Sequence, residues 1–188
     1  MLAAAAQPAL AAGEYPVREV LAAFATACSA VDDTAANAAG ALAVGWERLP
    51  PDSDELVSRV ARQGRRALED DNSGVTTIPG SEYRKQVGGR TLYLAISGAL
   101  LDGATARGCR VYDFTAPRAP TVEELEDWAG RPPEDPQTHR GAINYTWQPG
   151  LKPSHSDMQA IYVTPGSRPV PGFDIGGGLA LIASALEF

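Results

Sequence analysis

The most reactive side chains of the sequence are concentrated in Ser154-His155-Ser156-Asp157, with Lys152 just upstream. A hydroxyl, an imidazole and a carboxylate are the groups that act as nucleophile, base and orienting acid in a catalytic triad. Those groups must converge in space, whereas neighbours on an extended loop point in different directions. The stretch also lacks the Gly-x-Ser-x-Gly elbow of α/β-hydrolases. We therefore interpret it as a polar loop whose Asp157 caps the next strand or turn.

A metal centre would require His139 and His155 to meet a carboxylate such as Asp135 or Asp157. Two loops bring these residues within reach of one another in principle, but no His-x-x-x-His spacing is present. A hydrolase or metal-dependent enzyme that uses His139, His155 and Asp157 is therefore the alternative function. The sequence predicts no catalytic residue, metal or cofactor as its leading interpretation.

Three further motifs have simpler structural interpretations. The acidic run 69–74 lacks the alternating ligands and distal glutamate of a calcium loop, so it is expected to be a solvated turn. The triplet Gly176-Gly177-Gly178 lacks the lysine of a phosphate-binding loop. Arg62, Arg65 and Arg66 are expected on a solvated helix face. With a formal net charge of −7, the surface repels phosphate backbones, which argues against a nucleic-acid partner.

Aromatic residues in the predicted strands are the candidate ligand contacts. If several share one face of the sheet, they form a groove for a peptide, a glycan or a small apolar ligand. The open alternative is that they pack beneath loops. The five residues are Tyr93, Tyr112, Tyr145, Trp147 and Tyr162.

The strongest strand pattern lies between residues 81 and 117. Leu92, Leu94 and Ile96 alternate with more polar positions, as expected for a strand with one buried face. Gly88-Gly89 accepts the positive φ angles of a type I′ turn, so residues 83–87 should form the partner strand of a hairpin. Residues 102–108 are expected to be a turn before a third strand over 109–114.

Helix patterns dominate the first third of the chain. Apolar residues at three- and four-residue spacing predict a helix over 16–31, and an aspartate cap, Asp32 or Asp33, predicts a second helix ending near Val44. Asp52 and Thr121 begin the capping-box patterns of two more helices. Further strands are expected over 143–147 and 158–163, and residues 179–186 are expected to form a strand, with a short helix as the alternative. This order predicts an α+β fold in which the N-terminal helices pack on one face of a mostly antiparallel sheet of about 5–6 strands.

Cys28 and Cys109 are the only two cysteines. Cys28 lies on the apolar stripe of the first predicted helix, where a strand carrying Cys109 can reach it. One disulfide is typical of a protein folded in an oxidising compartment. Two free buried thiols are the alternative.

The N-terminus predicts secretion as well. Residues 1–13 are alanine-rich, and Ala9-Leu10-Ala11 resembles a small-x-small cleavage site at the end of a signal peptide that lacks its basic region. The alternative is a disordered alanine-rich N-terminus. Residues 14–188 are expected to form a single α+β domain, and no apolar run is long enough to be a transmembrane segment. The expected location is periplasmic or secreted.

Three points of the sequence are similar to small uncharacterised secreted bacterial proteins with a single helix-to-strand disulfide. They are Phe24-x-x-x-Cys28, Gly45-Trp46 and Cys109-x-Val111. The resemblance implies a location in the bacterial envelope and no activity.

These observations together predict a small periplasmic or secreted protein without catalytic activity. Its expected partner is an unknown protein or small-molecule ligand. A structural role in envelope assembly is a second alternative, and the sequence leaves the oligomeric state open.

Overall fold

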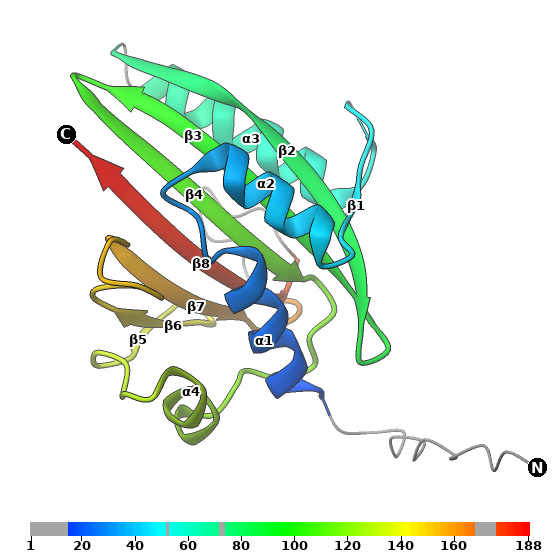
Figure 1. Cartoon of the computed structure of the whole chain (residues 1–188). Coiled ribbons are helices and arrows are strands. Elements are labelled where there is room, and N and C mark those ends of the chain that lie inside the picture. Colours follow the sequence, from blue (N-terminus) through cyan, green and yellow to red (C-terminus); the bar gives the residue numbers. More distant parts are fainter. Residues whose placement is uncertain (1–14, 52, 72–73, 168–175) are drawn as a thin grey trace, which may run out of the picture.

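The structure, a computed structural model, describes residues 15–51, 53–71, 74–167 and 176–188. Its centre is an eight-stranded antiparallel sheet (Figure 1). In order across the sheet, the strands are β1 (Glu47–Arg48), β2 (Val75–Val87), β3 (Arg90–Leu101), β4 (Ala104–Asp113), β8 (Gly178–Glu187), β7 (Asp157–Val163), β6 (Ala142–Trp147) and β5 (Gln137–His139). Four helices accompany the sheet. The α+β class is therefore as expected, but the sheet has more strands than the 5–6 that the sequence predicted.

Three of the four helices begin close to the predicted residue, whereas α3 begins at Leu56, later than the start predicted at Asp52, which itself lies outside the described residues. Asp33 caps α2 by accepting hydrogen bonds from the backbone N–H groups of Ala35 and Ala36, and Thr121 forms the expected capping box at α4. The first helix is shorter than the predicted 16–31, because it ends at Ala27 with Cys28 as its C-cap. The helices are α1 (Val17–Ala27), α2 (Thr34–Ala43), α3 (Leu56–Asp71) and α4 (Val122–Ala129).

The predicted hairpin is present and its register is the expected one. Strand β2 (Val75–Val87) pairs with β3 (Arg90–Leu101), and Val87 lies opposite Arg90. Gly88 and Gly89 form the two-residue turn with φ angles of 54° and 76°. Positive φ at both turn positions is the geometry of a type I′ turn, which suits the twist of the flanking strands.

The turn after β3 is much shorter than predicted. The sequence suggested a loop over 102–108, but β4 (Ala104–Asp113) begins two residues after β3 ends, so the turn consists of Asp102 and Gly103 alone. Residues 104–108 have modest β propensity, yet all of them pair with β3, and residues 105–108 also pair with β8. Pairing on both sides outweighs intrinsic preference.

The C-terminal half supplies the remaining strands. The three expected strands are β6 (Ala142–Trp147), β7 (Asp157–Val163) and β8 (Gly178–Glu187). The predicted long loop 131–142 contains the short edge strand β5 (Gln137–His139), and β1 (Glu47–Arg48) forms the opposite edge. Strands of two and three residues have no periodicity to detect, which is why the sequence missed them.

The helices cover both faces of the sheet, not one as expected. Helices α1, α2 and α4 pack on the face that carries Leu92 and Leu94, which forms the main core. Helix α3 lies behind the sheet in Figure 1, where Val57 packs with Ala95 and Tyr112 of the opposite face. Both faces of β3 and β4 are therefore buried.

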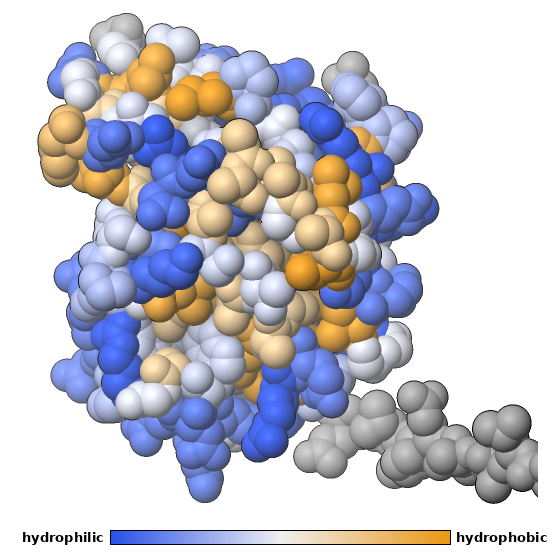
Figure 2. Space-filling model, in the orientation of Figure 1, coloured by the Kyte–Doolittle hydropathy of each residue, from blue (hydrophilic) through white to orange (hydrophobic). Residues whose placement is uncertain are grey.

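The outer surface on the α1–α2 side is a mosaic of polar and apolar residues (Figure 2). The alanine-rich α2 gives a pale orange band across the middle of this view, with Leu42 51% exposed. No helix in the described part of the chain is long and apolar enough to cross a membrane.

Candidate functional site

The loop with the Ser-His-Ser-Asp sequence joins β6 to β7 and packs against the connection between α1 and α2. The Ser154 hydroxyl donates a hydrogen bond to Asp32 Oδ2 at 3.1 Å. Asp157 is the first residue of β7, where its carboxylate accepts from Gln159. Ser154 and Asp157 thus bind different neighbours, and no hydrogen bond among the described residues joins either of them to His155.

His155 itself is almost fully buried, at 2% exposure. Neither ring nitrogen has a hydrogen-bond partner of ordinary geometry in the described part of the chain. Burial lowers the pKa of His155; the Asp32 carboxylate and the Ser29 backbone oppose this shift and Lys152 adds to it. The neutral imidazole is therefore the form that the fold favours, which fits a packed core residue better than a solvent-facing base.

His139 lies far from this environment. It is an exposed residue of the edge strand β5, whereas His155 is buried beneath the α1–α2 connection. Among the residues that the structure describes, no group of three or more histidine, cysteine, aspartate or glutamate side chains is arranged to hold a metal. The residues of the alternative enzymatic hypothesis are not brought together.

The five candidate aromatic residues divide between the two faces of the sheet. Tyr145, Trp147 and Tyr162 belong to the main core beneath α1 and α4. Tyr93 and Tyr112 lie on the opposite face, where each contacts the ring of Phe114. Four of the five are buried, and Tyr93 is partly exposed with its hydroxyl donating to Glu55. They do not form one shared surface.

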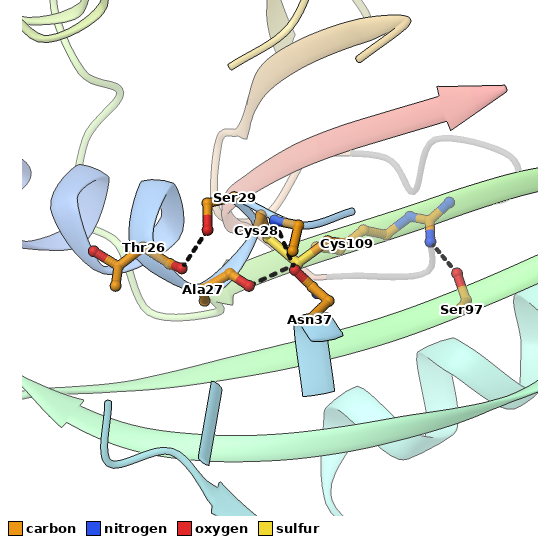
Figure 3. Close-up of a disulfide and its surroundings, with 9 residues drawn as sticks. Thr26, Ala27, Cys28, Ser29, Asn37, Ser97 and Cys109 are labelled. Carbon is orange, nitrogen blue, oxygen red and sulfur yellow. Dashed lines mark hydrogen bonds between the residues drawn. A yellow bond between two sulfur atoms is a disulfide. The ribbon is translucent and has the colours of Figure 1, made fainter. Parts of the chain in front are cut away.

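Cys28 and Cys109 form the predicted disulfide. The bond joins the end of α1 to β4 across 81 residues of sequence (Figure 3). Both residues are fully buried. Close to the bond, Asn37 of α2 accepts a hydrogen bond from the backbone N–H of Ala30, so the α1–α2 connection is held both to the sheet and to α2.

The other polar motifs are engaged in local structure. Arg62 donates to the Ser53 carbonyl and Arg65 lies 3.7 Å from the Glu82 carboxylate, so two of the three clustered arginines have partners within the fold. Gly178 lies against the backbone of Asp113, where a Cβ atom would come within 2.3 Å of the carbonyl oxygen. Part of the acidic run 69–74 lies outside the described residues.

A groove between α1 and α4 has a volume of about 670 Å³. This is within the range of small-molecule sites, roughly 300 to 1,000 Å³. Its lining combines apolar side chains with one basic and three acidic ones. The lining residues are Tyr15, Pro16, Val17, Arg18, Glu19, Leu21, Glu124, Asp127 and Trp128.

Tyr15 anchors the α1 end of the groove. Its ring is buried and lies 5.6 Å from the guanidinium of Arg90 and 6.0 Å from that of Arg118. Its hydroxyl faces the buried Asp113 carboxylate without forming a hydrogen bond of ordinary geometry. Burial, followed by the charge of Asp113, raises the pKa of Tyr15 above its usual range. Tyr15 is therefore a neutral structural wall.

The Asp113 carboxylate is the centre of a buried polar network. Arg90 donates to both of its oxygens, at 3.0 and 3.2 Å, and the Thr115 backbone and hydroxyl each donate to Oδ1 at 3.0 Å. The Asp113 side chain has no solvent exposure. These donors satisfy the buried carboxylate without water. Arg90 also lies over the ring of Tyr15, so the network contacts the residue that precedes α1.

The α4 wall is fixed by a second charged pair. Arg118 donates to both oxygens of Glu124 at 2.7 Å, and the Thr121 backbone N–H donates to Oε2 at 2.7 Å. These hydrogen bonds, that of Arg118 above all, lower the pKa of Glu124 to about 2. The Glu124 charge is thus neutralised inside the protein, which leaves it little capacity to attract a ligand.

Trp128 connects the groove to the core. Its ring lies 6.0 Å from that of Phe24 and 6.4 Å from that of Trp147, with the two indoles nearly perpendicular. Trp128 remains partly exposed, and it lines the groove on the α4 side. Because its contacts on the core side hold the ring, the indole is a rigid surface.

Sequence reasoning did not identify this groove. Its walls come from residues 15–21 and 124–128, more than 100 positions apart, and neither segment contains a motif associated with binding. The available signal was the unusual composition of α4, which has four acidic residues and one tryptophan among its eight positions.

Comparisons with protein-family models, with curated proteins and with solved structures find no match to this chain.

Proposed function

We propose that the protein is a non-catalytic binding protein of the periplasm or the extracellular space, and that its ligand docks in the groove between α1 and α4. The observation that carries this proposal is the construction of the groove. Its walls are held by bidentate Arg118–Glu124 hydrogen bonds and by the buried Asp113 network, while Arg18, Glu19, Asp127 and part of Trp128 remain accessible. A preformed cavity that combines apolar walls with placed charged groups is suited to a small-molecule ligand.

The disulfide supports the proposed location. A buried bond that joins a helix to a strand requires an oxidising environment to form and persist, as in the periplasm or outside the cell. The envelope resemblance at Phe24 and Cys28 agrees with this assignment.

The catalytic alternative has less support. A general base must lie within hydrogen-bond distance of the group that it activates. His139 is exposed on an edge strand, and His155 is buried with a lowered pKa. No observation in the described residues favours a hydrolase over a binding protein.

The groove can be tested by observing backbone amide NMR signals while small aromatic and aliphatic compounds are added one at a time. We expect signal changes to concentrate on residues 16–21 and 124–128. Arg18→Trp places a large ring on an exposed helical position that lines the groove, and it should abolish these changes. Leu42→Trp is the matched control, because Leu42 is exposed on α2 and does not line the groove.

Compounds that perturb other surfaces only, or that bind Arg18→Trp and the natural protein equally, would refute the groove as the ligand site.

The proposed location in the periplasm or the extracellular space has its own test. Protein isolated from its native source is alkylated without reduction and its intact mass is measured. We expect no alkylation, and modification of both Cys28 and Cys109 would contradict an oxidising compartment.

A further inference from the structure

The charge distribution around the groove is one-sided. Helix α4 has the sequence VEELEDWA, which contains four acidic residues and no basic one. The groove lining itself contains Glu19, Glu124 and Asp127 against the single basic residue Arg18. A cleft lined mainly by one sign of charge raises the local concentration of ligands of the opposite sign.

Two of the three lining carboxylates are available to a ligand. The third, Glu124, already accepts hydrogen bonds from Arg118 and from the backbone N–H of Thr121. Glu19 and Asp127 are exposed, and within the described ranges neither forms an ion pair. One lies on each helix, so a charged group between α1 and α4 meets a carboxylate on both walls.

The aromatic surface favours the same class of ligand. Tryptophan is the best of the aromatic side chains for binding a cation over its ring. Trp128 lines the groove and is held by Phe24 and Trp147, so its face needs no rearrangement on binding. Tyr15 cannot serve this purpose, since two guanidinium groups already lie over its ring.

An anion is the less suitable ligand. The N-terminus of α1 has no side-chain cap at Pro16, and the helix dipole there favours negative charge. However, Glu19 lies in the first turn of this helix, where a carboxylate already complements the helix dipole. An anion would be attracted by Arg18 and by the N-terminus of α1, but it would be repelled by the carboxylates of Glu19 and Asp127.

We infer that the groove binds a small organic cation, in which an ammonium or guanidinium group sits over Trp128 between Glu19 and Asp127 and an apolar portion contacts the partly exposed Pro16. This inference rests on the proposed binding function and names the ligand class for the same site. The cavity volume of about 670 Å³ accommodates such a molecule whole.

The test uses three probes with the same phenyl ring and different charge, namely phenethylamine, phenethyl alcohol and 3-phenylpropanoate. Binding to the full chain is measured at pH 7 by amide NMR and by calorimetry, at low and at physiological salt. We expect the amine to bind most tightly, the alcohol more weakly and the carboxylate weakest. Affinity for the amine should fall as salt rises, because salt screens exposed charges.

Asp127→Asn and Glu126→Gln form a matched pair of variants. Each removes one negative charge from exposed positions of α4, but Glu126 does not line the groove. Asp127→Asn should weaken amine binding about 3-fold, the scale of an exposed charge interaction. Glu126→Gln should leave the affinity unchanged. Glu19→Gln should resemble Asp127→Asn.

Equal binding of the amine and the alcohol, or tighter binding of the carboxylate, would overturn the cationic class while the groove remained the binding site. Equal effects of Asp127→Asn and Glu126→Gln would also overturn it, because the charge would then act only at long range. Absence of groove signals with all three probes would overturn this inference alone, since the proposed function is judged by the broader compound set and the Arg18→Trp variant.

Discussion

Reduction of the Cys28–Cys109 disulfide should remove a large share of the stability of this protein. The bond closes a loop across 81 residues. In the chain-entropy model, such a loop removes about 15 cal/mol/K of entropy from the unfolded chain, which is about 4.5 kcal/mol at 25 °C. Domains of this size are stable by about 5 to 15 kcal/mol, so the bond supplies a third or more of a typical total.

The assay is urea unfolding of the oxidised protein, the reduced protein and the Cys28→Ala/Cys109→Ala variant. Reduction keeps both sulfur atoms in the core and should lower the free energy of unfolding by about 4.5 kcal/mol. The melting temperature should then fall by about 9 to 18 °C, at about 2 to 4 °C per kcal/mol. The double variant should lose about 1 kcal/mol more, because both side chains are fully buried and their truncation leaves small cavities.

The slope of the urea transition provides a second criterion. Without the cross-link the unfolded chain is more expanded and exposes more surface, so the slope should increase in the reduced protein. A reduced protein whose unfolding free energy lies within about 1 kcal/mol of the oxidised value would refute the reasoning. The bond would then not be limiting the freedom of the unfolded chain.

Three further predictions concern single side chains. Arg90→Met should lower the free energy of unfolding by about 3 kcal/mol, because it leaves the buried Asp113 carboxylate without its cation. The control is Arg84→Met, which breaks an exposed ion pair and should lower the free energy of unfolding by less than about 1 kcal/mol in the same urea assay. Thr121→Ala should cost about 1 kcal/mol through loss of the α4 cap, again by urea unfolding, and an unchanged stability would show that the cap contributes nothing. Because burial lowers the folded-state pKa of His155, the unfolded chain binds more protons as the pH falls below about 6.5, so stability should decline from that pH downward. His155→Gln should flatten this decline between pH 7 and pH 5, His139→Gln should leave it in place, and equal profiles for the two variants would contradict the assignment.

The elements with local signals were predictable from sequence. The Gly88-Gly89 turn fixed the β2–β3 register, and the Thr121 capping box fixed the start of α4. Both signals act within a few residues, so they do not depend on the rest of the fold. The disulfide was predictable as well, because Cys28 continues the apolar spacing of the first predicted helix and the sequence contains only one other cysteine.

The elements that depend on distant partners were not predictable in this way. Residues 104–108 are strand because β3 and β8 flank them, and the side of the sheet that α3 occupies is decided by Val57 and its contacts with Ala95 and Tyr112. The aromatic candidates failed to gather for a related reason. Alternation assigns a residue to one face of its own strand, but it does not say which face of the sheet is covered by a helix.

The groove depends on contacts between residues that are far apart in the sequence, whereas the charge of one of its walls is visible in the sequence of α4. Helix α4 is acidic by sequence, but an acidic helix is usually a solvated one. It becomes one wall of a cavity because Phe24 and Trp128 bring α1 against it, and because the Arg90 and Arg118 guanidinium groups hold Tyr15 at the start of α1. Those two arginines are themselves hydrogen-bonded to carboxylates, Arg90 to Asp113 and Arg118 to Glu124. Apart from Arg18, the positive charge near the groove is therefore paired within its walls, while the carboxylates of Glu19 and Asp127 stay exposed in the lining.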